Sequence, residues 1–225
     1  MNKIDQLRYS EIRGGLRVRL MDAQIHAEEL KNAISRPVGC GYVLAAYLEL
    51  PEAFKGGGVV TLPREFSKIC GMDERTILSD AMEGSCAMSF PRLTPIENVL
   101  FGDEPMNLLT GDQMPDGAQM LVLTAGDGIL GASALFFPEM TDRIARIVGG
   151  NYYVLPSSIH EVLIMPEGSR LTPEEMALMV RDVNENEVFP NERLGNRVLH
   201  YRGDLHMLQV AADLDRDVTS REERS

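Results

Sequence analysis

Paired apolar runs of strand length, separated by turn residues, fill the sequence after residue 119 and constrain its fold most strongly. Each pair flanks a short polar break: "QMLVLTA" and "ILGASALFFP", "YYVL" and "EVLIM", and "RVLHY" and "LHMLQV". Such pairs are typical of β-hairpins. Helical stretches separate them, so the predicted order is β-β-α-β-β-α-β-β. The sequence therefore predicts an α+β fold, an antiparallel sheet built from hairpins with short helices packed on one of its faces.

The two helices of this region are marked by their ends. "PEMTDRIARIVGG" ends at a glycine pair, and its apolar residues Met140, Ile144, Ile147 and Val148 share one stripe. "LTPEEMALMVRDVNENEV" begins with Thr172 as N-cap and has Glu175 at the third helical position, the spacing of a capping box. For this second helix we expect a buried stripe of Met176, Met179, Val180 and Val183.

The first half of the chain is less regular. "YVLAAYLEL" predicts a strand over 42–50, residues 64–70 and 73–85 predict a helical pair, and "DAQIHAEELKNAIS" has the charge and spacing of a short amphipathic helix. Composition shifts divide the chain into five predicted segments. These are a variable N-terminal segment 1–39, a strand-plus-helical-pair region 40–102, a connector 103–118, an α+β domain 119–211 and a disordered charged tail 212–225.

Composition is that of a soluble globular protein, with 225 residues of which 44% are hydrophobic and 25% charged. No apolar run approaches the roughly 18 residues that cross a bilayer. The N-terminus "MNKIDQLRYSEIRGG" lacks the apolar core of a signal peptide. We therefore expect a cytoplasmic protein that does not associate with membranes.

The sequence indicates no metal site and no cofactor. Its three cysteines have no C-x-x-C spacing, and its four histidines form no ligand pair on one helix face. His200 and His206 flank a predicted turn and could approach each other, but two ligands do not make a metal site.

A net charge of −12 disfavours nucleic-acid binding, which depends on Lys and Arg neutralising phosphates. Arg13, Arg17 and Arg19 cluster in "EIRGGLRVRL". A solvated strand or helix face is the favoured interpretation of this cluster, and nucleic-acid binding is the weaker alternative. "FSKICGMDERTILSDA" imitates a helix-turn-helix, but Asp80 takes a normally apolar position and acidic residues dominate the would-be recognition helix.

The stretch "LPSSIHE" carries the strongest candidates for catalysis, Ser157, Ser158, His160 and Glu161. Nucleophilic catalysis needs a serine oxygen beside a base that a third group orients. In an extended strand Ser158 and His160 project to one face and Glu161 to the other, so a local triad is incomplete. A hairpin turn whose hydroxyls satisfy backbone groups is the favoured interpretation. The alternative is a hydrolase-like enzyme that uses Ser157 or Ser158 with His160 and a carboxylate from elsewhere.

Several blocks between about residues 40 and 210 resemble the C-terminal part of a bacterial family, domain of unknown function 5688. In chain order they are "TLPREFSKICGMDERTILSDAMEGS", "FPRLTPIENVL", the segment ending "LFFP", "YYVLPSSIHEVLIMPE" and "MVRDVNENEVFPNERLGNRVLHY". Residues 1–39 lie outside this resemblance. The resemblance implies a bacterial cytosolic setting among genes of mobile elements, and it brings no activity, cofactor or catalytic residue.

These observations favour a non-enzymatic module that binds or regulates a protein partner. No catalytic or metal constellation is complete, the composition is acidic, and the chain has 13 methionines. Met106, Met114 and Met120 lie in or beside predicted loops, where adaptable apolar side chains suit binding. Core filling is the other interpretation of the methionines, and we expect it for Met176 and Met179.

Overall fold

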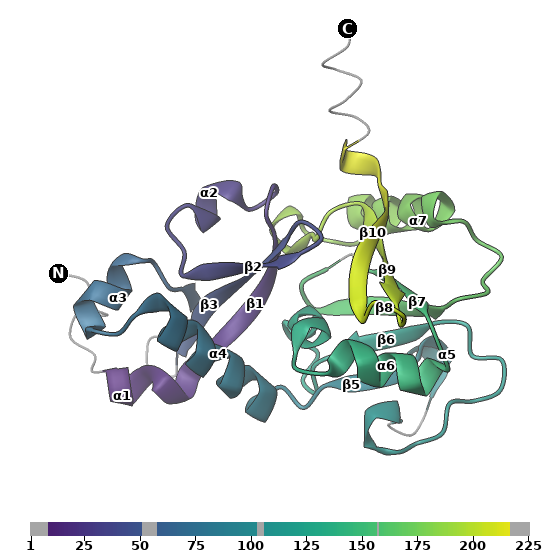
Figure 1. Cartoon of the computed structure of the whole chain (residues 1–225), viewed down its shortest axis with the longest axis horizontal. Helices are drawn as coiled ribbons and strands as arrows, with labels where there is room; N and C mark the ends of the chain where they lie inside the picture. Colours follow the sequence, from purple (N-terminus) through teal and green to yellow (C-terminus); the bar gives the residue numbers. More distant parts are fainter. Residues whose placement is uncertain (1–8, 51–57, 103–105, 157, 217–225) are drawn as a thin grey trace, which may run out of the picture. The chain divides into compact units, whose positions relative to one another are not determined.

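A computed structural model describes residues 9–50, 58–102, 106–156 and 158–216 of the chain. The chain divides into two compact units, Met1–Phe90 and Pro91–Ser225 (Figure 1). The predicted connector 103–118 lies within the second unit. The last residues of the predicted tail, 217–225, fall outside the described residues, whereas its first two belong to a strand.

Unit 1 is a four-stranded antiparallel sheet built around the predicted strand 42–50, here β3 (Tyr42–Leu50). Strand β1 (Leu16–Asp22) pairs along one side of β3, while β2 (Ser35–Gly39) and β4 (Gly58–Thr61) share the other side. The helical elements of the unit are α1 (Tyr9–Ile12), η2 (Arg13–Gly15), α2 (Ala27–Leu30), α3 (Glu65–Cys70) and α4 (Glu74–Met88).

The predicted helical pair is confirmed as α3 and α4. Helix α3 ends at Gly71, whose φ of 69° is left-handed, and α4 begins where the Asp73 carboxylate accepts a hydrogen bond from the Thr76 N–H. The expected helix over 22–35 is wrong, because only the four residues of α2 are helical there. The Asp22 carboxylate instead accepts two consecutive backbone N–H groups and turns the chain back.

Helix α4 covers the free edge of β1 at very short range. The buried Ser85 hydroxyl accepts a hydrogen bond from the Val18 N–H at 2.8 Å. At the preceding position, a β-carbon on Gly84 would lie only 2.4 Å from the Leu16 carbonyl oxygen. The edge of the sheet is thus closed by a helix backbone, which needs glycine at this crossing.

The arginine cluster of the N-terminal region is matched by carboxylates. Arg17 and Arg19 lie on β1 with side chains only 10% and 15% exposed, beside Glu49 and Glu29. The expectation of a solvated basic face is therefore wrong for these two residues, since their guanidinium groups are drawn into the fold by nearby acids. Arg13 is more exposed and pairs with Asp80 and Glu83.

Unit 2 contains a six-stranded antiparallel sheet in the order β10-β9-β7-β8-β6-β5. Its α+β class, with antiparallel strands and short helices, is the one predicted. Two predicted hairpins, β7 with β8 and β9 with β10, are confirmed. The strands are β5 (Arg92–Pro95), β6 (Leu121–Thr124), β7 (Tyr152–Leu155), β8 (Glu161–Pro166), β9 (Arg197–Arg202) and β10 (Met207–Asp213).

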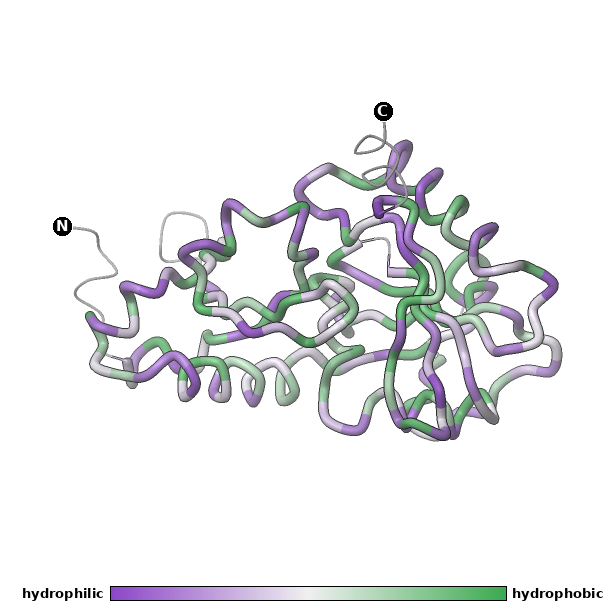
Figure 2. Tube along the Cα trace, turned by 45° about the horizontal axis from the view of Figure 1, so that its top comes forward, coloured by the Kyte–Doolittle hydropathy of each residue, from purple (hydrophilic) through white to green (hydrophobic). Residues whose placement is uncertain are grey.

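Helices cover both faces of this sheet, so the expectation of one covered face is wrong. On one face the Tyr152 and Tyr201 rings stack at 4.9 Å, and Tyr152 donates to a backbone oxygen of α6 (Met140–Val148). On the other face α7 (Pro173–Asn186) packs on a core that includes Leu155 and Val198. The residues of β7 that point to either side of the sheet are aromatic or aliphatic, and Figure 2 shows the whole chain coloured by hydropathy. Each face therefore needs a cover.

The capping box of α7 is confirmed, with Thr172 and Glu175 bonded to each other's backbone N–H groups. Its predicted buried stripe is only half right. Met176 and Val180 are buried, whereas Met179 and Val183 are 41% and 40% exposed.

The predicted hairpin over 119–138 is wrong in its second half, much of which forms the 3-10 helix η4 (Gly131–Phe136). Strand β6 already has β8 on one side and β5 on the other, so no edge remains for a hairpin partner. The remaining short elements are α5 (Ile96–Phe101), η3 (Leu108–Thr110) and η5 (Pro190–Glu192). Among the helices that the structure describes, none is both long enough and apolar enough to cross a membrane.

Candidate functional site

The "LPSSIHE" stretch forms the connection of the β7–β8 hairpin, as the turn interpretation predicts. Ile159 donates its N–H to the Glu192 carbonyl at 2.9 Å, and its own carbonyl accepts the Ala132 N–H at 3.2 Å. Ser158 forms an isolated bridge with Arg193. The turn is therefore held between η4 and η5 by backbone hydrogen bonds. Ser157 lies outside the described residues.

The structure brings Ser158 and His160 together, but the serine hydroxyl contacts the backbone N–H of the histidine and not its ring. The Ser158 hydroxyl accepts a hydrogen bond from the His160 N–H at 3.2 Å, as in a turn. In the described part of the chain no hydrogen bond joins this hydroxyl to the imidazole. The geometry is therefore that of a hydroxyl satisfying a backbone group.

Both ring nitrogens of His160 face other partners. Nδ1 accepts a hydrogen bond from the Leu130 N–H at 3.3 Å, which fixes the ring proton of the neutral form on Nε2. Nε2 lies 3.4 Å from a carboxylate oxygen of Glu192. Leu130 has a left-handed φ of 54°, so the imidazole supports a residue in an unfavourable backbone conformation. Sequence reasoning found His160 but neither of these partners.

Glu161, the first residue of β8, is half-buried, and burial raises the pKa of its carboxyl, with the charge of His160 lowering it in part. A carboxyl with a raised pKa binds its proton more tightly in the folded state than in the unfolded state. Its contribution to stability is therefore present at low pH and is lost as pH rises through the folded-state pKa.

Replacing Glu161 with glutamine is expected to change the unfolding free energy more favourably at about pH 7 than at about pH 4. The amide has nearly the same shape and no charge to desolvate. Urea denaturation of both chains at the two pH values measures the difference in unfolding free energy. A difference that stays constant between the two pH values would show that burial of this carboxylate has no energetic consequence.

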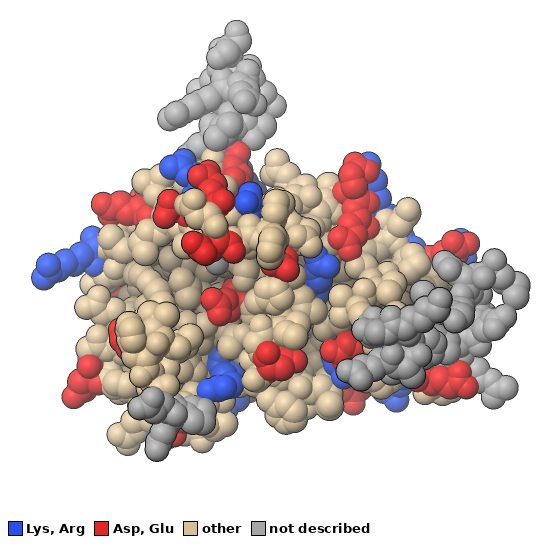
Figure 3. Space-filling view, turned by 180° about the vertical axis from the view of Figure 1, so that it is seen from behind, with Lys and Arg blue, Asp and Glu red and all other residues tan. Residues whose placement is uncertain are grey.

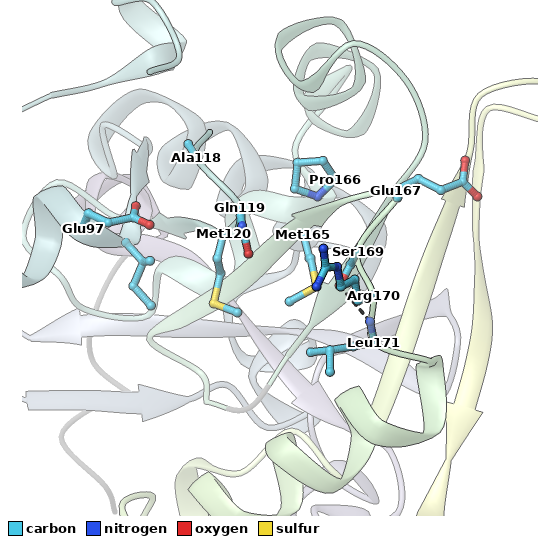
Figure 4. Close-up of a pocket in the computed structure, with 12 residues that line it drawn as sticks. Glu97, Ala118, Gln119, Met120, Met165, Pro166, Glu167, Ser169, Arg170 and Leu171 are labelled. Atoms are coloured by element: carbon cyan, nitrogen blue, oxygen red, sulfur yellow. Dashed lines mark hydrogen bonds between the residues drawn. The ribbon is translucent and has the colours of Figure 1, made fainter. Parts of the chain in front are cut away.

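A second feature of unit 2 is a cleft of about 850 Å³ at the point where β6 begins and β8 ends (Figure 4). The two strands pair from Leu121 and Ile164 onwards, and the chain before β6 bonds instead to the start of α5, through the Ile96 N–H and the Met120 carbonyl. The lining residues are Ile96, Glu97, Ala118, Gln119, Met120, Met165, Pro166, Glu167, Gly168, Ser169, Arg170 and Leu171.

The floor of the cleft is apolar and connects to the core below α7. Met120 and Met165 present their thioethers towards the cavity (Figure 4). Met165 is buried in the cluster that contains Met176 and Val180, and the partly buried Met120 packs against the same cluster. The loop methionine that the sequence marked as a binding candidate is thus part of this cleft.

The charged residues of the cleft occupy different positions around it. Arg170 and Glu97 lie on opposite sides of the cavity, while the Glu167 carboxylate points away from it (Figure 4). Glu167 accepts a hydrogen bond from Asn151 Nδ2 at 3.0 Å and lies 3.2 Å from His200 Nε2. Its charge is therefore engaged outside the cleft.

His200 and His206, which flank the β9–β10 turn, contact different partners. His200 stacks on Tyr153 and faces Glu167, whereas His206 Nδ1 lies 2.8 Å from the Asp142 carboxylate. Within the described ranges of the chain, no three His, Cys, Asp or Glu side chains gather in a way that fits a metal ion. On the face shown in Figure 3, acidic side chains are more abundant than basic ones, and the basic ones lie among them.

Comparison with models of protein families gives a match. The model of a family of unknown function (DUF5688) matches residues 2–203. Restricting the resemblance to the C-terminal part is therefore wrong, because residues 2–39 belong to the match as well. No curated protein and no solved structure matches the chain.

Proposed function

The chain belongs to this family of unknown function, and on that premise we propose that it is a non-enzymatic module that binds a polypeptide segment of a protein partner. The cleft of unit 2 is the proposed binding site. We propose the cytoplasm as its location, a choice supported by the three cysteines, none of which forms a disulfide in the structure. The bacterial setting among genes of mobile elements stays a prediction.

The methionine floor of the cleft is the observation that carries this proposal. Ligand sites are concave and mostly apolar, with a few polar groups that orient the ligand. Met120 and Met165 supply apolar surface, and Arg170 and Glu97 supply polar groups. Thioether side chains adapt their shape to a range of apolar partners, which suits a binding surface more than a reaction centre.

The contacts of the hairpin turn support a structural role for the residues considered as catalytic. The Ser158 hydroxyl and the His160 ring are engaged with backbone groups and with Glu192. The cleft is lined by none of Ser158, His160 and Glu161. Enzymatic use of the turn would require these contacts to be exchanged for others, so the hydrolase interpretation is the less favoured of the two.

Site-specific photo-crosslinking tests the proposed site. A photoreactive amino acid replaces Gln119, an exposed residue of the cleft, and in a matched control it replaces Arg181, an exposed residue of α7 outside the cleft. In cells of the source species we expect a discrete covalent adduct with another polypeptide from position 119 and several-fold less from position 181. Equal labelling at both positions, or no adduct at position 119, would contradict the proposal.

A further inference from the structure

We infer that the cleft selects a segment that presents a carboxylate to Arg170 and, next to it, an apolar side chain to the methionine floor. This inference rests on the proposed function and names the chemistry of the bound segment. It follows from the two kinds of surface that meet in the cleft, the thioethers of Met120 and Met165 and the guanidinium of Arg170.

The apolar part of the site packs on the core cluster that contains Met165. Met165 is only 4% exposed and packs in the core cluster, so the accessible apolar surface comes from more exposed lining residues such as Ile96, Met120 and Leu171. The Leu171 N–H donates to the Ser169 hydroxyl at 3.2 Å, which orders the loop that carries Arg170 between them. An aliphatic or aromatic side chain on the bound segment would remove this surface from water.

The guanidinium of Arg170 is free to receive an anion. It makes no ion pair or hydrogen bond with any other residue that the structure describes. Glu167, three positions earlier, is engaged by Asn151 and His200, and Glu175 closes the capping box of α7. The carboxylates of Glu167 and Glu175 are therefore directed elsewhere. An arginine beside an apolar surface binds a carboxylate through two parallel charge-assisted hydrogen bonds.

Glu97 restricts where the carboxylate of the bound segment can lie. It stands across the cavity from Arg170, and it too has no hydrogen bond or ion pair within the described part of the chain (Figure 4). A carboxylate placed on this side meets a like charge, which opposes binding in the reverse direction. The pair thus orients the segment, with its acidic group at Arg170 and a neutral or basic group towards Glu97.

Panning a randomised peptide library displayed on phage against the full chain tests this inference. We expect the enriched peptides to share an Asp, a Glu or a C-terminal carboxylate close to a large apolar residue. Synthetic versions with free and with amidated C-termini then distinguish a terminal carboxylate from a side-chain one. Binding of each peptide to the cleft is verified by its crosslinking to the photoreactive group at position 119.

The charge reversal Arg170→Glu is expected to weaken the enriched acidic peptides at least about tenfold, and to strengthen versions in which Lys replaces the acid. Arg181→Glu is the matched control, because Arg181 is also exposed and lies outside the cleft. It should change the affinities by less than about twofold.

The possible outcomes separate the two proposals. Peptides that crosslink at position 119 but share no acidic group, or that bind Arg170→Glu unchanged, would overturn the inference and leave the proposed function standing. If no enriched peptide crosslinks at position 119, a peptide-binding cleft is itself contradicted.

Discussion

Replacing Gly131 with alanine is expected to destabilise the protein by roughly 3 kcal/mol, the upper end of the usual cost of overpacking a core. A β-carbon at this position would lie 2.1 Å from the Ala125 nitrogen, 2.6 Å from the Thr124 carbonyl carbon and 2.7 Å from the His160 carbonyl oxygen. All three atoms belong to the backbone, so no side-chain rotation relieves the contact. Either η4 must move away from β6, or the hairpin turn at His160 must move with it.

Urea denaturation followed by circular dichroism measures this effect. Gly150→Ala is the matched control, since a β-carbon there meets nothing within 4 Å and the backbone is not left-handed. It should change the unfolding free energy by no more than about 0.5 kcal/mol. Equal unfolding midpoints for the two variants would mean that the close approach of η4 to the turn contributes nothing to the fold.

The segment after β6 is a 3-10 helix and not the expected strand because contacts with residues distant in sequence decide its conformation. "ILGASALFFP" is apolar enough for a buried strand and also for a buried 3-10 helix, and periodicity does not separate the two. The decision depends on contacts with residues distant in sequence, such as the bond between Leu130 and the His160 ring, 30 positions apart. No local pattern contains that information.

Features fixed by neighbouring residues were predictable. The capping box of α7 and the β7–β8 hairpin depend on side chains and turn residues within a few positions of one another. The exposure of Met179 was not predictable in this way, because the helical stripe to which it belongs is wide and only the placement of the helix on the sheet decides which edge is covered.

The two candidate sites also differ in whether residues close together in the sequence form them. "LPSSIHE" is contiguous, so the sequence could mark it and recognise it as a turn. The cleft is assembled from three separate segments, 96–97, 118–120 and 165–171, which meet only because β6 and β8 are neighbours in the sheet. Met120 alone carried a sequence signal, as a methionine beside a loop, and nothing local connected it with Arg170.

In unit 1 the largest expected effect belongs to Gly84→Ala, which should destabilise the protein by about 1–2 kcal/mol. Two opposing terms decide the value. Alanine is favoured over glycine inside a helix by up to about 1 kcal/mol, so on propensity alone the variant would be more stable. Against this, the new β-carbon would lie 2.4 Å from the Leu16 carbonyl oxygen and 2.9 Å from Arg17 Nη1, which donates to that same oxygen.

The steric term outweighs the propensity gain because α4 cannot withdraw from β1 without cost. Moving the helix would lengthen the bond between the Ser85 hydroxyl and the buried Val18 N–H, and an unsatisfied buried donor costs about 1–3 kcal/mol. Thermal and urea unfolding of Gly84→Ala, beside Gly14→Ala as a glycine with no atom within 4 Å of its β-carbon, measures the outcome. A Gly84→Ala chain more stable than the parent would show that helix propensity dominates and that the edge of β1 does not depend on the close approach of α4.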